Sequence, residues 1–457
     1  MRALLLLLDS VGIGFAPDAA QYGDAGTNTL GHIAEKLPGF ALPNLCSLGL
    51  GELLPNSFSG GASYGANYGR MQERSAGKDT TTGHWELAGV IQEEPFATFQ
   101  HFPEDLVRQI EREADAHFIG NCVASGTAII AELGEQHLQS GNPILYTSAD
   151  SVLQIAAHEE IVPLSRLYEI CQVARRAADP YRIGRIIARP FTGAPGNFRR
   201  TAGRHDYSMR PPSTVLDALN ERGIRVVGVG KIGDIFAGRG ITHSFSTTSN
   251  RAGMEKIDDL WRAGVDGLIF ANLVDFDMLF GHRRDVSGYA NALREFDDWL
   301  GEFLPRILPN DLVIITADHG NDPTFQGTDH TREQVPLFVL HHGENRDLGI
   351  RETFADVAAS LAAYFSISWP TGTSFLTHHI PPEGRAPASA LDGLRRGESA
   401  RPVSFVTLQP GCRVESYSWS SFCVSSCQAS SVLCQVLSGL KRSISLKIFR
   451  VSGPRSF

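Results

Sequence analysis

The stretch ALLLLLDSVG, residues 3–12, places five consecutive leucines directly before Asp9 and a glycine-containing turn. An uninterrupted apolar run is typical of a central strand that is buried on both faces of a parallel sheet. The sequence therefore predicts a strand over residues 4–8, with Asp9 at its carboxyl end. In open α/β sheets, that end of the strands is where ligands bind.

The pattern of an apolar run followed by acidic or polar residues recurs along the chain. It is found at residues 225–230, 267–275, 312–318 and 336–340. Between these runs, residues 286–304 and 354–365 carry apolar side chains at helical spacing, which favours helices packed on the sheet. Alternating strands and helices predict a doubly wound α/β core.

The character of the sequence changes over residues 93–208, where a helical pattern, short apolar pieces and an Arg-rich loop replace the long apolar runs. We expect this segment to be an inserted α+β cap domain, with residues 1–92 and 209–376 as the two parts of the core domain. Residues 377–457 are rich in Pro, Arg, Ser and Cys without sustained periodicity, which favours a disordered or aberrant C-terminal tail. Its four cysteines lack the paired spacing of a zinc site.

Charge is unevenly distributed over the 457 residues. The formal net charge is −9, but residues 379–457 hold ten Lys or Arg against four Asp or Glu, which leaves −15 for residues 1–378. This acidic body argues against a nucleic-acid partner, and a protein of such charge that handles phosphates is expected to bind cations. The N-terminal apolar run is too short for a signal peptide and no run reaches the roughly 18 residues of a membrane span, so we expect a cytoplasmic protein with no membrane partner.

Three aspartates and three histidines stand at or just after predicted strand ends, in segments far apart in the sequence. They are Asp9, Asp277, His282, Asp318, His319 and His330. Mixed carboxylate and imidazole ligands suit Mn²⁺ or Zn²⁺. Two such ions about 4 Å apart can clamp a phosphoryl group. Each residue alone could equally be a helix cap or a satisfied polar group, but their joint occurrence predicts a metal site.

A nucleophile for such a site is available in residues 77–86, GKDTTTGHWE, which contain three consecutive threonines. A threonine hydroxyl activated by a metal can accept a phosphoryl group and later return it without a separate base. Thr80, Thr81 and Thr82 are chemically equivalent in this respect, and sequence spacing cannot choose among them.

Five segments of the chain resemble the signatures of the phosphopentomutase family, a part of the alkaline phosphatase superfamily. They are Asp9-Ser10 and residues 77–89, 272–285, 317–321 and 327–336, and the similarity extends from residue 1 to about residue 376. The resemblance implies an alkaline-phosphatase-like core with a cap domain. It also implies that Thr80 is the phosphorylated threonine, that Asp9, Thr80, Asp318 and His319 bind one metal ion, and that Asp277, His282 and His330 bind the other.

The resemblance further implies a reaction of nucleoside salvage, in which α-D-ribose 1-phosphate and ribose 5-phosphate, or their 2-deoxy forms, are interconverted. The implied cofactors are two manganese ions, with a sugar 1,6-bisphosphate such as glucose 1,6-bisphosphate as activator. The implied partners are small-molecule pentose phosphates, and the implied state is a monomer. Positions that match the family's sugar and phosphate contacts are Ser148, Asp150, Val152, Arg185, Ile187, Arg200 and Lys231.

Two other functions fit parts of the pattern. A cofactor-independent phosphoglycerate mutase or a phosphodiesterase would use two metals and a Ser or Thr nucleophile on the same core, but residues 78–86 and 283–285 argue against both. A catalytically silent metal-binding or scaffold protein would be favoured if a ligand position were replaced, and none of the seven is. Without the resemblance, Arg185 and Arg200 would be interpreted as solvated surface charges.

Overall fold

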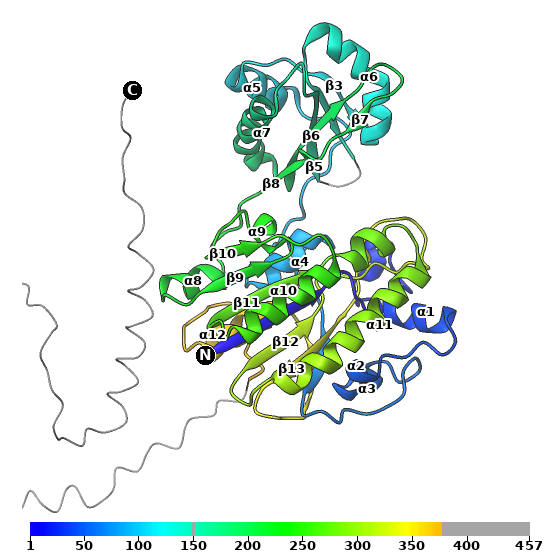
Figure 1. Cartoon of the computed structure of the whole chain (residues 1–457), viewed down its shortest axis with the longest axis vertical. Helices are drawn as coiled ribbons and strands as arrows, with labels where there is room; N and C mark the ends of the chain where they lie inside the picture. The colour runs from blue at the N-terminus through cyan, green and yellow to red at the C-terminus, as the bar shows by residue number, and fades with distance from the viewer. Residues whose placement is uncertain (149–150, 377–457) are drawn as a thin grey trace, which may run out of the picture. The chain divides into compact units, whose positions relative to one another are not determined.

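The computed structural model describes residues 1–148 and 151–376, which contain two β-sheets (Figure 1). The first sheet has eight strands in the order β10-β9-β11-β1-β12-β13-β2-β14. Their bounds are β1 Arg2–Leu8, β2 Asn67–Met71, β9 Val226–Val229, β10 His243–Phe245, β11 Gly267–Leu273, β12 Leu312–Thr316, β13 Val335–Leu340 and β14 Asp347–Arg351. The five strands from β10 to β12 are all parallel, as the α/β pattern predicted.

Strand β1 lies between β11 and β12 and is buried on both faces. The side chains of its five leucines are each no more than 1% exposed, which explains the uninterrupted apolar run. Leu7 is in register with Asn272 of β11 and Thr316 of β12. Asp9, two residues later, therefore emerges beside the ends of both neighbouring strands.

Strand β13 departs from a wholly parallel sheet, because it pairs antiparallel with β12. Residues 317–334 join the two strands and contain no helix. A parallel return is usually made by a crossover helix, which this segment lacks, and β13 instead runs back beside β12. The connecting segment consequently stays near the carboxyl end of β12, and it carries Asp318, His319 and His330.

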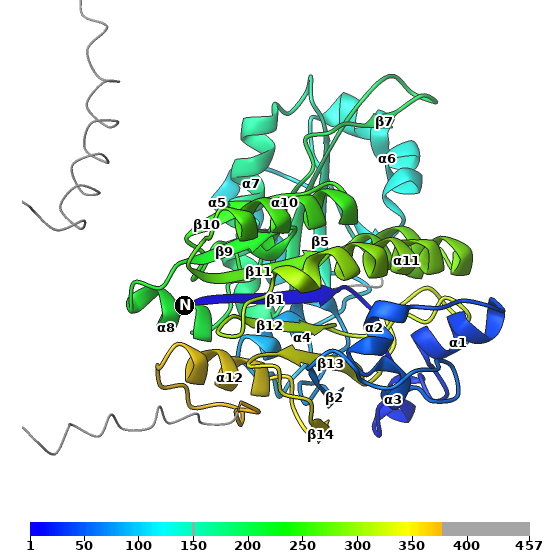
Figure 2. The same ribbon diagram turned by 60° about the horizontal axis from the view of Figure 1, so that its bottom comes forward.

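Two groups of helices pack with this sheet. In the first, α10 (Asn250–Arg262) contacts β11 and α11 (Val286–Phe303), and α11 contacts α1 (Thr29–Lys36) and α2 (Pro43–Ser47). In the second, α12 (Asp356–Tyr364) contacts α4 (Thr80–Leu87) and α8 (Val215–Glu221). Figures 1 and 2 show α10 and α11 running along the sheet. The helices predicted over residues 286–304 and 354–365 correspond to α11 and α12.

The second sheet has the strand order β3-β4-β5-β6-β7, with β8 paired to β6. Its strands are β3 Ile119–Val123, β4 Ile144–Thr147, β5 Val152–His158, β6 Arg185–Thr192, β7 Arg199–Arg200 and β8 His205–Ser208. Helices α5 (Glu104–Ala114) and α7 (Leu164–Ala178) share one apolar cluster with it, and α6 (Gly126–Ser140) shares another (Figure 1). This sheet falls within the segment predicted to be the cap domain, whose boundaries at residues 93 and 208 remain predictions.

Among the described residues, no helix combines the length and apolarity that crossing a membrane requires. The cysteines at positions 46, 122 and 171 are free thiols. The expected disordered or aberrant tail, residues 377–457, lies outside the described residues, and so does Asp150.

Candidate active site

Four of the predicted metal ligands lie at the carboxyl ends of three neighbouring strands. Asp9 follows β1, Asp318 and His319 follow β12, and Asp277 lies in a short π-helix, Phe276–Gly281, after β11. Because these strands are parallel neighbours, their carboxyl ends meet at one edge of the sheet. All four side chains are buried.

Asp9, Asp318 and His319 form a first group that could hold an ion, with ligand atoms all within 4.8 Å of one another. His319 Nε2 lies 3.6 Å from Asp9 Oδ1 and 3.3 Å from Asp318 Oδ2. His319 Nδ1 lies 3.0 Å from the carbonyl oxygen of Gly320, to which a protonated nitrogen can donate. Burial lowers the pKa of His319. In the neutral ring with its proton on Nδ1, Nε2 has a lone pair that faces the two carboxylates. This is the arrangement that a histidine metal ligand needs.

A second group combines Asp277 and His330 with the same His319. His330 Nε2 lies 3.5 Å from Asp277 Oδ1. His282 stands beside this group, with its Nε2 3.1 Å from Asp277 Oδ2 and its Nδ1 2.7 Å from the Thr328 carbonyl oxygen. The structure thus gathers the three residues that the resemblance assigned to the second ion, and it makes His319 a member of both groups.

Two of the three consecutive threonines, Thr80 and Thr82, have different side-chain contacts. Thr80 is the first residue of α4, and the preceding Asp79 caps the helix by accepting hydrogen bonds from the backbone N–H groups of Thr81 and Thr82. Thr80 Oγ1 lies 3.1 Å from His319 Nε2. Thr82 Oγ1 donates instead to Asp79 Oδ2 at 2.5 Å. The hydroxyl of Thr80 therefore contacts a candidate metal ligand, a distinction that sequence spacing could not make.

The electrostatics of the cluster fit a divalent cation. Burial, and then repulsion from Asp318 and Asp277, raises the pKa of Asp9 well above its usual range. Burial also opposes ionisation of Asp277, but the neighbouring His330 and His282 hold its pKa well below the usual range. Among the described residues, the buried atoms Asp9 Oδ1 and His330 Nε2 have no hydrogen-bond partner. Buried polar atoms without partners are costly, and a metal ion would satisfy both.

Six of the seven predicted substrate contacts lie among the described residues. Ser148 follows β4, Val152 begins β5, Arg185 and Ile187 lie on β6, Arg200 ends β7, and Lys231 follows β9. Val152 and Arg185 are in register on neighbouring strands, whereas the backbone of Arg200 pairs near the opposite end of β6. Lys231 follows a strand of the first sheet, and the other five residues lie on or directly after strands of the second. The predicted substrate contacts therefore come from the regions of both sheets.

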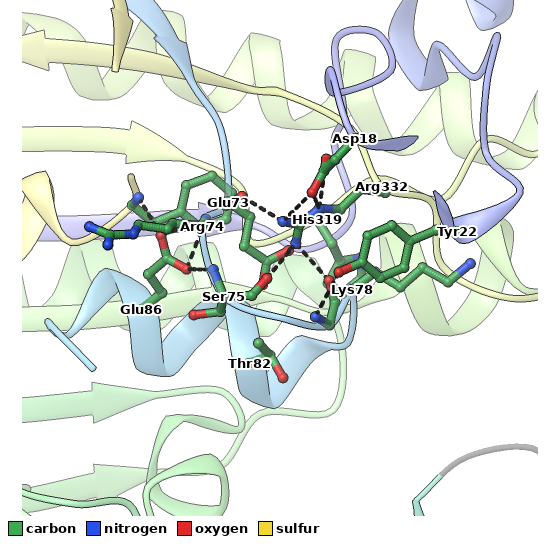
Figure 3. Close-up of polar contacts among 12 residues, drawn as sticks. Asp18, Tyr22, Glu73, Arg74, Ser75, Lys78, Thr82, Glu86, His319 and Arg332 are labelled. Atoms are coloured by element: carbon green, nitrogen blue, oxygen red, sulfur yellow. Dashed lines mark hydrogen bonds and ion pairs between the residues drawn. The ribbon is translucent and has the colours of Figure 1, made fainter. Parts of the chain in front are cut away.

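A layer of polar residues around the ligands was missed at the sequence level. Asn321 Nδ2 donates to Asp277 Oδ1 at 2.7 Å, and His84 Nδ1 lies 3.0 Å from Asp318 Oδ2. The buried Arg332 contacts the loop that leads to Thr80 (Figure 3). Asn321 and Arg332 stand within segments that carry the family resemblance, but residue type and spacing do not reveal what they contact.

Comparison with known proteins agrees with this geometry. A model of the Metalloenzyme superfamily matches residues 1–369, so the fold and the ligand cluster define a metalloenzyme of that superfamily. The phosphopentomutase of Carboxydothermus hydrogenoformans is 54% identical over 380 residues, which cover 82% of this chain and 98% of the relative. Those of Caldanaerobacter subterraneus and Syntrophotalea carbinolica are 53% and 51% identical, and each match covers 82% of this chain and 97% of the relative.

The chain belongs to the phosphopentomutase family. It is an enzyme of the isomerase class, an intramolecular phosphotransferase. The family and the alkaline-phosphatase-like α/β fold class that the sequence predicted are both confirmed. Use of a divalent metal is supported by the superfamily and by the two ligand groups.

Solved structures resemble the chain more remotely. Phosphoglycerate mutase of Leishmania mexicana is 12% identical with a TM-score of 0.41, covering 82% of this chain and 97% of its own. Alkaline phosphatase from the Antarctic bacterium TAB5 is 13% identical with a TM-score of 0.32, covering 80% of this chain and 98% of its own. The family assignment rests on the sequence relatives.

Proposed function

We propose that the enzyme interconverts α-D-ribose 1-phosphate and ribose 5-phosphate, or their 2-deoxy forms, through a phosphothreonine at Thr80. The observation that carries this proposal is the 3.1 Å contact between Thr80 Oγ1 and Nε2 of His319, the histidine shared by both ligand groups. A phosphoryl group on Thr80 would lie at the amino end of α4, where the helix dipole favours negative charge. The family name of the relatives supports pentose phosphates as the substrates.

Two metal ions, manganese by family resemblance, fit the donor set. One would be held by Asp9, Thr80, Asp318 and His319, and the other by Asp277, His282 and His330. When bound, such ions polarise phosphoryl oxygens and favour the ionised form of a coordinated hydroxyl. The hydrogen bond from Asn321 to Asp277 and the contact of His84 with Asp318 would keep the ligands oriented.

The proposed cycle contains two phosphoryl transfers. In the first, a hydroxyl oxygen of the sugar monophosphate attacks the phosphorus on Thr80, the Oγ1–P bond breaks, and the sugar proton ends on Thr80 Oγ1. The product is a sugar bisphosphate. In the second, Thr80 Oγ1 attacks the other phosphate, and the proton returns to the released sugar oxygen. A sugar 1,6-bisphosphate such as glucose 1,6-bisphosphate would prime the enzyme by phosphorylating Thr80 in the same way.

The bisphosphate must turn over without escaping, so the sugar and its distal phosphate need their own contacts. We propose the second sheet as the cap that supplies them, through Ser148, Val152, Arg185, Ile187 and Arg200, with Lys231 from the first sheet. Arg185 Nη1 lies 3.7 Å from Asp206 Oδ2. The guanidinium has further N–H groups that could donate to a phosphate. Asp150, predicted for the same role, lies outside the described residues.

The test is conversion of ribose 1-phosphate to ribose 5-phosphate with Mn²⁺ and catalytic glucose 1,6-bisphosphate. We expect the native enzyme and Thr81→Ala to be active, and Thr80→Ala to be inactive and to carry no phosphate when its peptides are analysed by mass spectrometry. Release of inorganic phosphate by the native enzyme, or no action on pentose phosphates, would overturn the mutase assignment. Full activity of Thr80→Ala would overturn the phosphothreonine.

A further inference from the structure

The loop of residues 72–79 joins β2 to α4, ends at the nucleophile, and has no helix or strand of its own. Its peptide groups therefore need partners elsewhere in the protein. The side chain of Arg332 provides them for the carbonyl oxygens of three alternate residues: Nη2 lies 2.6 Å from that of Glu73, and Nη1 lies 2.9 Å and 2.6 Å from those of Ser75 and Gly77 (Figure 3). One guanidinium thus holds one side of the loop.

The same guanidinium is fully engaged with two carboxylates. Nη1 of Arg332 donates to Glu73 Oε2 at 2.6 Å, and Nη2 and Nε donate to Asp18 Oδ2 at 2.9 Å and 3.2 Å. Arg332 is only 2% exposed, so its charge needs these partners. Lysine places its three donors on a single atom and cannot reproduce the planar fork that reaches all these acceptors.

The other side of the loop is held by an anion. The carboxylate of Glu86 accepts hydrogen bonds from the backbone N–H of Arg74 at 2.9 Å and of Ser75 at 2.6 Å (Figure 3). Glu86 belongs to α4, the helix that begins at Thr80. The loop backbone is therefore held between a cation, which binds its carbonyls, and an anion on the nucleophile's own helix, which binds its amides.

The backbone at Arg332 is fixed independently of its side chain. Its N–H donates to Asp24 Oδ2 at 2.8 Å, and its carbonyl accepts from Ala16 N–H at 3.0 Å. The preceding Thr331 exchanges two backbone hydrogen bonds with Gly320, of 2.8 Å and 3.0 Å. Changing the guanidinium should therefore leave in place the chain segment that carries His330.

From these contacts we infer that Arg332 is a positioning residue for phosphoryl transfer, which holds the carbonyls of residues 73, 75 and 77 so that Thr80 is presented to His319. This inference rests on the proposed role of Thr80. Arg332 touches neither the nucleophile nor the ligand groups in the described contacts, so it acts through the loop backbone. A displacement of about 1 Å at the reacting atom can cost about 100-fold in rate.

The experiment compares Arg332→Lys with a matched control, Arg2→Lys. Arg2 also binds a carboxylate, that of Asp311, and a carbonyl, that of Trp261, but at the opposite end of the sheet. We expect kcat of Arg332→Lys to fall by about 100-fold, with KM and Mn²⁺ affinity close to native. In the metal-free protein, we also expect faster amide hydrogen exchange in residues 73–82 of Arg332→Lys than of Arg2→Lys.

A second variant guards against simple misfolding. Arg332→Gln combined with Glu73→Gln removes the cation together with the carboxylate that would otherwise be buried without it, while Asp18 is partly exposed and can be hydrated. This double variant should fold and show the same loss of kcat. Native kcat and native amide exchange in both variants would overturn the inference. Inactivity of the native enzyme on pentose phosphates would instead overturn the proposed function, and the exchange comparison would still test the role of Arg332 in the loop.

Discussion

Charged side chains are arranged differently at the two ends of strands β1 and β12. At the amino ends, Arg2 Nε lies 3.1 Å from Asp311 Oδ1, and each charge has a partner of opposite sign. At the carboxyl ends, Asp9 and Asp318 lie close together, and Asp9 has a buried oxygen without a hydrogen-bond partner among the described residues. The strands are in the same parallel register throughout, so the difference lies in the side chains.

The charges at the amino ends of the two strands concern stability, whereas those at the carboxyl ends are candidates for function. A paired, partly buried charge stabilises the fold or costs it little, whereas buried carboxylates that lie close together repel one another until a cation binds. Burial and the nearby carboxylates raise the pKa of Asp9, which is the electrostatic sign of that cost. We therefore expect the carboxyl end to serve binding and chemistry, and the predictions below test the contrast, beginning with the largest effect.

Asp9→Asn should produce the largest effect. Loss of a candidate ligand is expected to lower mutase activity and Mn²⁺ affinity by more than about 100-fold, the upper size of effects from residues that only support a ligand. Without metal, the variant should unfold at a temperature no lower than the native protein, because it removes a buried like charge. Calorimetry with and without Mn²⁺ checks this, and unchanged metal affinity would contradict the assignment of Asp9.

Mn²⁺ itself should stabilise the native enzyme. A ligand that binds only the folded state at 100 times its Kd adds about 2.7 kcal/mol to the free energy of unfolding. Urea unfolding in chelator and in Mn²⁺ measures this gain. The gain should fall in Asp9→Asn, which keeps only the proposed site at Asp277, His282 and His330 intact, and persist in full in Asp311→Asn, which lies at the amino end. An equal gain in both variants would place the metal elsewhere.

Asp311→Asn should affect stability rather than chemistry. It weakens the contacts of the carboxylate with Arg2 and with the backbone N–H of Leu308. We expect the free energy of unfolding to fall by about 2 kcal/mol, as for loss of a partly buried charged hydrogen bond. Activity per folded molecule should stay native with and without added Mn²⁺. A large fall in kcat of the folded variant would contradict the view that the amino ends of the strands affect stability and not catalysis.

Glu333 provides a test of pH dependence. This buried carboxyl accepts hydrogen bonds from Gly14, Thr29 and Thr331, yet burial raises its pKa from 4.5 to about 7. A raised folded pKa means that the folded state holds its proton more tightly, so the stability contributed is present below pH 4.5 and is lost as pH rises toward 7. The loss amounts to about 1 kcal/mol per pH unit within that window.

Glu333→Gln should remove this dependence. The amide oxygen can accept from the backbone N–H groups of Gly14 and Thr29, and the hydroxyls of Thr29 and Thr331 can rotate to accept from the amide nitrogen. Unfolding of the metal-free native and variant proteins is measured from pH 4.5 to 7. Parallel stability curves would show that Glu333 does not titrate in this range.

Much of the framework was predictable from short-range patterns. The leucine run of β1 and the apolar runs of β11 and β12 predicted buried parallel strands; Asp9 directly follows β1, and Asp318 is the second residue after β12. The antiparallel course of β13 was not predicted, because strand direction depends on whether the connection contains a crossover, and an apolar run carries no direction. The joint occurrence of acidic and histidine segments was enough to predict a metal site, although the role of each residue in it remains a proposal.

The sequence by itself determined which strands are buried, that carboxylates and imidazoles stand at their ends, and that the chain resembles one enzyme family. Only the tertiary structure decided that His319 belongs to both candidate ligand groups, that Thr80 rather than Thr82 contacts it, and that Arg332 contacts the loop before Thr80. The physical reason is the distance in sequence between the residues that set each property. Burial and periodicity are properties of neighbouring residues, whereas hydrogen-bond and ligand geometry depend on atoms brought together from segments hundreds of residues apart.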